Sequence, residues 1–94
     1  MDVQFEWDEA KALANLLNHG ISFEEAKTVF GDPFALTIFD DKHSLTEDRF
    51  IDIGFSTSGR LLIVVYTERG ARIRLISSRE ATARERTYYE QRAN

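Results

Sequence analysis

The chain has 94 residues, no cysteine and a formal net charge of −4 at pH 7. This length predicts one small domain over residues 1–94, and a hydrophobic content of 43% is enough for a single core, which argues against disorder. The lack of cysteine excludes a disulfide scaffold and a thiolate metal site, and no apolar run is long enough to cross a membrane. The first residues lack the basic and apolar regions of a secretory signal, so a cytoplasmic protein is expected.

The first predicted elements are a short strand and a helix. Residues 3–7 alternate apolar and polar side chains, which is typical of a half-buried strand. Asp8 can then cap a helix that stops at Gly20, where glycine permits the left-handed backbone. Four apolar residues recur at helical spacing and are expected to face the core: Ala10, Leu13, Ala14 and Leu17.

A second helix, four strands and a last helix follow. Ser22 and Glu25 have the spacing of a capping box, and their helix is expected to end at residues 31–33. Further strands are predicted over residues 34–40, 49–56, 61–66 and 71–77, with a polar loop over 41–48 and a terminal helix over 81–90. The order β-α-α-β-β-β-β-α predicts an α+β domain. In it, an antiparallel sheet packs against two N-terminal helices and one C-terminal helix.

The basic residues are concentrated towards the end of the chain. Eight of the twelve lie in residues 60–94; all eight are arginine and they face four acids there, a balance of 8 − 4 = +4. Residues 1–59 contain four bases and twelve acids, a balance of 4 − 12 = −8. Guanidinium groups match phosphate oxygens in pairs and stay charged at any working pH. The asymmetry predicts a phosphate-contacting surface on an otherwise acidic protein.

Arg72 and Arg74 are the most informative pair in that segment. The period of a strand sends both side chains to the face away from the apolar residues of the same strand. Arg79 follows just past the strand end. Arg49 can join these arginines from a neighbouring strand. It can do so only from the frayed start of that strand, because Arg49 shares a face with the isoleucines of the same strand. A solvated face is the simpler reading of one such pair, but a larger cluster repels itself unless an anion or an acidic partner neutralises it. An anion-binding role is therefore favoured.

Several other side chains can transfer protons. His43 lies in the polar loop, and a histidine side chain can take or give a proton near neutral pH, although a plain exposed histidine is the simpler interpretation. Glu47 precedes Arg49 by two residues and forms either a surface ion pair or a base beside a phosphate clamp. Tyr88 and Tyr89 are ambiguous, since one can pack on the sheet while the other reaches solvent.

The remaining candidates favour structural roles or are absent. His19, in the last turn of the first helix, is more simply explained by a favourable interaction with the helix dipole. The sequence contains no phosphate-binding glycine loop, no elbow serine and no metal-binding histidine pair. Any catalysis must then use His, Glu, Tyr and Arg side chains without a cofactor.

These residues, in this order, resemble the BrnT family of bacterial type II toxins. The matching segments span nearly the whole chain and include residues 5–8, 19–26, 53–56, 59–62, 64–67 and 72–74. The resemblance implies a RelE-like fold and a ribonuclease toxin that halts translation. It also implies an antitoxin with a ribbon-helix-helix part, and operator DNA bound only through that antitoxin. The site residues that it implies are His43, Glu47, Arg49, Arg72, Arg74, Arg79 and Tyr89.

Two positions depart from the family, which often has lysine where this chain has Asn18 and Glu80. Losing a cation beside Arg79 is expected to weaken the local field, so that activity is reduced or the RNA contact moves.

The expected chemistry is metal-independent attack of an RNA 2′-OH on the adjacent phosphate. The arginines stabilise charge; Glu47 or His43 is the base, and His43 or Tyr89 the acid. Two alternatives stay open. The chain can be a non-catalytic module that docks an acidic partner and helps it bind DNA, or a degenerate toxin retained for its antitoxin contact.

Overall fold

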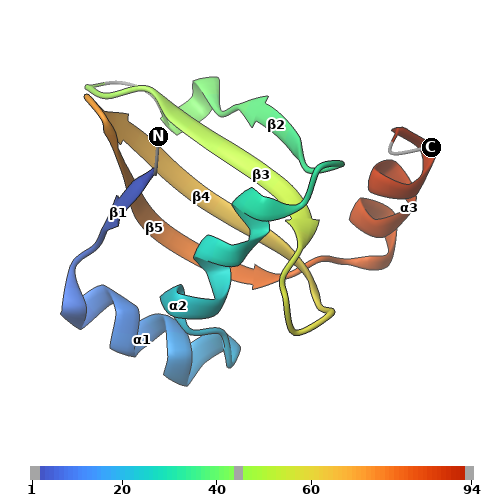
Figure 1. Cartoon of the computed structure of the whole chain (residues 1–94), viewed down its shortest axis with the longest axis horizontal. Coiled ribbons are helices and arrows are strands. Elements are labelled where there is room, and N and C mark those ends of the chain that lie inside the picture. Colours follow the sequence, from blue (N-terminus) through green and yellow to red (C-terminus); the bar gives the residue numbers. More distant parts are fainter. Residues whose placement is uncertain (1–2, 44–45, 93–94) are drawn as a thin grey trace.

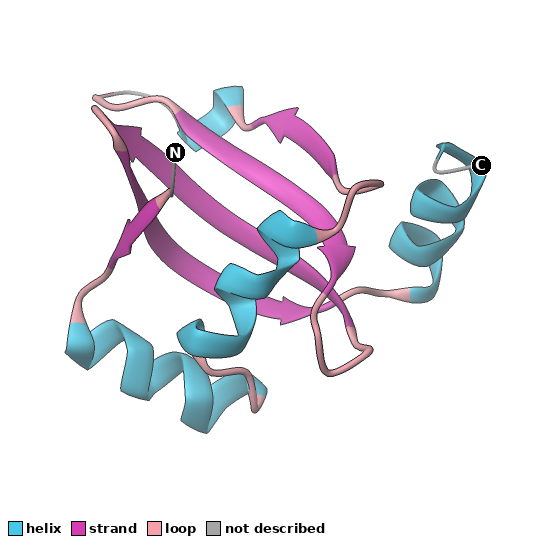
Figure 2. Ribbon diagram, viewed as in Figure 1, coloured by secondary structure: helices cyan, strands magenta, loops and turns pink. Residues whose placement is uncertain are grey.

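Five strands form one sheet in the computed structural model, which describes residues 3–43 and 46–92 (Figures 1 and 2). The strands are β1 (Gln4–Glu6), β2 (Leu36–Phe39), β3 (Arg49–Phe55), β4 (Leu61–Arg69) and β5 (Arg72–Glu80). The helices are α1 (Glu9–His19), α2 (Phe23–Ala26) and α3 (Ala83–Arg92), with 3₁₀ turns η1 (Lys27–Gly31) and η2 (Asp41–His43). The predicted α+β class and element order are confirmed. Residues 44 and 45 of the predicted loop lie outside the described part. No helix within that part is both long and apolar enough to span a membrane.

The spatial order of the strands is β1-β5-β4-β3-β2, so β4 is central. Its first six residues are apolar on both faces, as a strand covered from both sides requires. Strands β2 to β5 pair antiparallel as predicted, whereas β1 joins the edge of β5 in parallel, with Phe5 opposite Ile73. The first strand can run parallel because two helices separate it in sequence from the rest of the sheet.

One face of the sheet is covered by α2 and η1 (Figure 2). Phe23, Ala26 and Val29 pack there against Leu62 and Val64 of β4. The approach is close at Gly54 of β3, where a Cβ atom would lie 2.9 Å from Val29 Cγ1 and 3.0 Å from Ala35 Cβ. Glycine at this position therefore lets η1 reach the sheet.

Helix α1 packs with the opposite orientation from the predicted one. Leu13 and Leu17 are 59% and 76% exposed, and Leu16 is also exposed. The buried residue is Asn15, whose amide nitrogen donates to Ile21 O at 2.9 Å and to Ser78 O at 2.8 Å, while its oxygen accepts from Ser78 N at 3.0 Å. The prediction that the apolar stripe faces the core is wrong, because helical periodicity identifies an apolar face but not what covers it.

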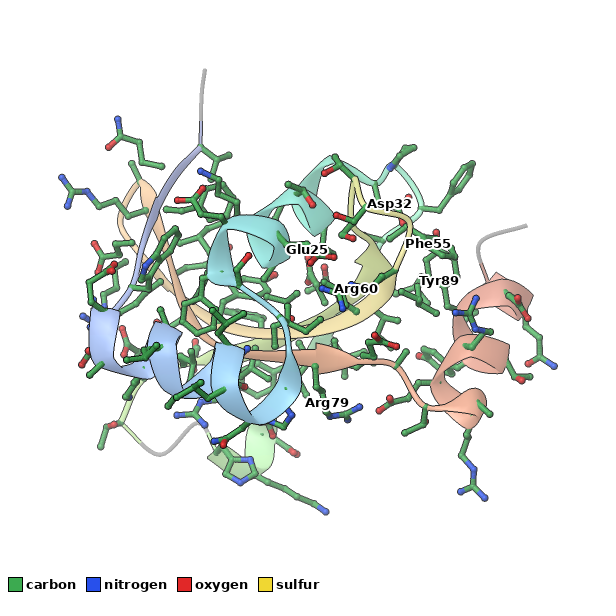
Figure 3. The ribbon with its side chains drawn as sticks, turned by 90° about the horizontal axis from the view of Figure 1, so that it is seen from below. Glu25, Asp32, Phe55, Arg60, Arg79 and Tyr89 are labelled. Atoms are coloured by element: carbon green, nitrogen blue, oxygen red, sulfur yellow. The ribbon has the colours of Figure 1, made fainter. Side chains whose placement is uncertain are left out.

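The capping box is only half formed. Ser22 Oγ accepts from Glu25 N–H at 3.0 Å, but the Glu25 carboxylate binds Arg60, from the turn between β3 and β4. Arg60 Nε donates to Glu25 Oε2 at 3.0 Å, and its Nη2 donates to Gly20 O at 3.1 Å (Figure 3). The hydrogen bonds from Arg60 lower the Glu25 pKa, which burial alone would raise. One guanidinium thereby ties both N-terminal helices to the sheet.

Candidate functional site

The sheet face away from α2, here called the open face, carries a row of polar side chains across three strands. Arg49 of β3 lies opposite Thr67 of β4, and Thr67 lies opposite Arg74 of β5. The β3 isoleucines face the same side, since Ile51 and Ile53 line a hollow of this face together with Ile63 of β4. The prediction that Arg49 can join only from a frayed start was wrong, because it placed those isoleucines on the opposite face from the arginines.

A hollow of about 140 Å³ opens over this row and is here called the cationic hollow. It is lined by Lys11, His43, Thr46, Glu47, Arg49, Thr67, Arg69, Arg74 and Ile76. Four cations and one acid give these side chains a balance of 4 − 1 = +3 with histidine neutral. Thr67 is buried, and its hydroxyl makes no hydrogen bond to another described residue. Four of the seven predicted site residues therefore meet here: His43, Glu47, Arg49 and Arg74.

His43 is held by a neighbouring carboxylate. Its Nδ1 lies 2.9 Å from Asp40 Oδ2, and its side chain is 63% exposed. If Nδ1 carries the proton that Asp40 accepts, then Nε2 is the ring nitrogen that can accept another. Asp40 was not predicted as an orienting residue. The only sequence indication is its position three residues before His43, which the tight turn η2 converts into a contact.

Glu47 pairs with Arg69 rather than with Arg49. Arg69 Nε donates to Glu47 Oε2 at 2.8 Å, and Arg69 Nη2 donates to Oε1 at 3.1 Å. This paired hydrogen bond is the main cause that lowers the pKa of Glu47, and the charges of Arg74 and Arg49 lower it further. Glu47 is therefore ionised and held by a guanidinium, which disfavours it as a proton acceptor.

Arg72 and Arg74 share a face but not the hollow. Arg74 lines it, whereas Arg72 is 61% exposed at its outer side. Glu6 of β1 bridges them, with Oε2 3.0 Å from Arg74 Nη1 and Oε1 3.5 Å from Arg72 Nη1. An acid from the N-terminal half thus lies among the arginines, and the Arg74 hydrogen bond is the main cause of its lowered pKa.

Arg79 lies further along the open face. It lines a second hollow of about 330 Å³ together with His19 and Ser77. Both terminal nitrogens of Arg79 lie 2.8 Å from the carboxylate oxygens of Glu85, and this pairing lowers the Glu85 pKa to about 2. Arg79 is therefore neutralised by an acid from α3, and a ligand phosphate has to compete with that acid.

Lys11 and His19 reach the open face for one reason. They lie four residues before and after Asn15, so all three form a polar stripe on α1. Asn15 binds β5, and the stripe therefore follows the edge of the sheet. From the sequence, no role was predicted for Lys11, and His19 was expected only to interact with the helix dipole. The spacing of the three polar residues was the available indication.

Tyr89 does not join the other predicted site residues. Its hydroxyl donates to Asp32 Oδ2 at 2.7 Å, and its ring packs edge-on against Phe55 (Figure 3). Burial, followed by the hydrogen bond to Asp32, raises its pKa to about 12. Tyr89 thus anchors α3, and Figure 3 shows it away from Arg79. Tyr88 is the tyrosine that lines a hollow of the open face.

The two departures from the family lie outside the cationic hollow. Asn18 is exposed on α1. Glu80 pairs with Leu62 in the sheet, next to the pair of Arg79 with Ile63, so the two side chains point to opposite faces. Glu80 instead approaches Arg60, with a distance of 3.4 Å from its Oε1 to Arg60 Nη1. The expectation that residue 80 weakens the field at Arg79 was based on their being adjacent in sequence. Adjacent residues of a strand point to opposite faces, so the two side chains do not lie together.

The fold and the hollow define a class: small α+β proteins that present a cationic, histidine-bearing hollow on the open face of a sheet. The family model described as "Ribonuclease toxin, BrnT, of type II toxin-antitoxin system" matches residues 7–85. The chain therefore belongs to the BrnT family.

One solved structure supports the fold. The crystal structure of the Brucella abortus ribonuclease toxin BrnT superposes with a TM-score of 0.67 and 23% sequence identity. The match covers 86% of this chain and 99% of that one. At this identity the likeness establishes the fold. No curated protein sequence matches the chain.

Proposed function

We propose that this chain is a ribonuclease toxin that cuts RNA without a metal ion, and that the cationic hollow is its active site. Residues 1–94 act as one domain, and the toxin halts translation in the cytoplasm. The observation that carries the proposal is the row Arg49–Thr67–Arg74 beside a histidine held by a carboxylate. The row supplies positive charge for a phosphate, and the histidine can accept a proton.

The proposed reaction uses the RNA as its own nucleophile. His43 Nε2 takes the proton of a 2′-OH, whose oxygen attacks the adjacent phosphorus. The bond from phosphorus to the 5′ oxygen breaks, which leaves a 2′,3′-cyclic phosphate and a 5′-OH. Arg49 and Arg74 stabilise the charge that builds on the phosphoryl oxygens. Arginine is a poor proton carrier, so Lys11 is the candidate that protonates the leaving oxygen.

Cleavage in the presence of a chelator tests this reaction. Purified protein incubated with RNA and EDTA should produce cyclic-phosphate ends, and His43→Gln should slow the cleavage by roughly 10²–10⁴. Lys42→Gln is the matched control, because Lys42 is an exposed neighbour in η2 that does not line the hollow. Cleavage that requires added metal would overturn the metal-independent reaction, and no cleavage at all would support the non-catalytic or degenerate module instead.

Membership of a type II toxin–antitoxin family implies an antitoxin partner. We propose that this partner has a ribbon-helix-helix part, brings the complex to operator DNA, and docks on α1. The exposed leucines Leu13, Leu16 and Leu17 lie there, beside a hollow of about 310 Å³ that also includes Trp7 and Phe23. An exposed apolar patch on one helix marks an interaction site.

The acidic side chains around this apolar patch favour a basic antitoxin segment over a second copy of the chain. Glu9 and Glu24 line the same hollow, and Lys27, 2.9 Å from Glu24, lies outside its lining. A second copy related by a two-fold axis would place these acids against themselves. An antitoxin segment with apolar residues flanked by lysine or arginine fits both features.

Replacing Leu16 with glutamate should weaken the antitoxin complex at least tenfold, because it puts a further acid into the apolar contact. Titration calorimetry of the purified chain with its antitoxin measures the change. Phe34→Glu, at an apolar residue that is also exposed but lies between η1 and β2, should bind as the unchanged protein does. Equal affinities for all three proteins would remove α1 from the interface.

A further inference from the structure

Beyond the second hollow, the open face continues into a third one of about 330 Å³, here called the apolar hollow. Its walls are Ile38 of β2, Ile51 and Ile53 of β3, Ile63 of β4, and Tyr88 of α3. Arg79 lines this hollow as well as the second, so the two are continuous. Ile38 remains 37% exposed, which shows that α3 covers the isoleucines only in part.

The apolar hollow lies in line with the cationic hollow along β4. Thr67 lines the cationic hollow and Ile63 the apolar one, and both side chains face the same side. Four residues of an antiparallel strand cover roughly 14 Å, at about 3.4 Å per residue. His19, Ser77 and Arg79 line the path between them. An RNA strand whose phosphate sits in the cationic hollow can thus lay a neighbouring nucleotide over the apolar one.

We infer that the apolar hollow binds a nucleobase of the RNA substrate, one that neighbours the cleaved phosphate. The inference rests on the proposed function, because it takes the same strand as its ligand. A base offers flat apolar faces that suit the isoleucines and the Tyr88 ring, and stacking on an aromatic side chain tolerates any base. Arg84 lines the hollow and supplies positive charge for the adjoining phosphate, whereas Arg79 can do so only in competition with Glu85.

The charge around the hollow favours RNA over a protein segment as its occupant. Two arginines and one acid, Glu85, line it, and Glu85 is already paired with Arg79. A third arginine, Arg92, stacks on the Tyr88 ring with its guanidinium carbon 3.7 Å from the ring centroid. An apolar protein segment gains little from this cationic edge, whereas a phosphate next to a buried base gains from it.

Binding is tested directly with small ligands that carry or lack a base. The isoleucine methyl resonances of the labelled full chain are followed by NMR during titration with adenosine 5′-monophosphate, uridine 5′-monophosphate and ribose 5-phosphate. Both nucleotides should shift Ile38, Ile51 and Ile63 methyls in a saturable way, and ribose 5-phosphate should not. Equal shifts with all three ligands, or none, would overturn the inference. This readout needs no cleavage, so it stands apart from the test of the reaction.

Enzyme kinetics provide the second test. Tyr88→Ala should raise KM for an oligonucleotide about tenfold and change kcat little, since losing one stacked base weakens binding of ground and transition states alike. Thr87→Ala is the control on the same helix, because Thr87 is exposed and does not line the apolar hollow. A Tyr88→Ala protein with unchanged KM would count against the base site. If that protein loses antitoxin affinity instead, the hollow is a protein-docking site.

Discussion

Replacing Arg74 with alanine is expected to slow RNA cleavage by about 10²–10³, the usual loss when one contact to transition-state charge is removed. Arg74 lines the cationic hollow and lies opposite Thr67, while Arg49 lies on the other side of Thr67, two strands away. Arg49 therefore cannot replace the Arg74 guanidinium. The loss should appear in kcat, because the extra phosphoryl charge exists only in the transition state. Single-turnover cleavage of a labelled oligonucleotide measures it, and expression of the variant should no longer stop growth.

Arg72→Ala is the sharpest comparison for this experiment. Arg72 lies on the same strand and the same face, and it pairs with the same acid, Glu6, but it does not line the hollow. Its loss should change the rate by less than about threefold, because exposed charges act weakly across solvent. A thermal melt checks that both variants stay folded. If Arg72→Ala and Arg74→Ala lose activity equally, the cationic hollow is not the reaction centre.

Replacing Asn15 with leucine should lower the free energy of unfolding by roughly 3 kcal/mol, which is large for a domain of this size. Strand β1 pairs only with the first three residues of β5, so the edge of β5 near Ser78 has no strand beside it. The Asn15 amide binds both the N–H and the C=O of Ser78 there, and also Ile21 O. Leucine has the same branched shape and the same number of side-chain heavy atoms, but it leaves these three buried groups without their hydrogen bonds to Asn15.

Urea unfolding followed by circular dichroism measures this loss. Asn18→Leu is the control, because Asn18 lies on the same helix but is exposed, and its replacement should change stability by less than about 0.5 kcal/mol. A drop in melting temperature of more than about 10 °C is expected for Asn15→Leu alone. Equal stability of the two variants would mean that the amide contributes nothing to the edge of β5.

The distribution of charge along the chain correctly predicted a basic surface, but it did not show where on the fold that surface lies. Within residues 3–43 and 46–92, five of the eight C-terminal arginines form ion pairs: Arg60, Arg69, Arg72, Arg74 and Arg79. The first four each pair with an acid of the N-terminal half, namely Glu25, Glu47 or Glu6. Polarity in sequence is therefore partly cancelled in space, while the side chains that line the cationic hollow keep a balance of +3.

The order of elements, the α+β class and the face that Arg72 and Arg74 share could all be predicted from the residues alone. These follow from local rules, since the periods of helix and strand, caps and turns depend on residues close in the chain. The folded arrangement was needed to show that Arg74 enters the hollow while Arg72 stays outside, that α1 turns its leucines to solvent, and that Tyr89 anchors a helix. Each of these depends on which strand or helix lies alongside, and that choice is made by long-range packing and hydrogen bonds such as those between Asn15 and Ser78.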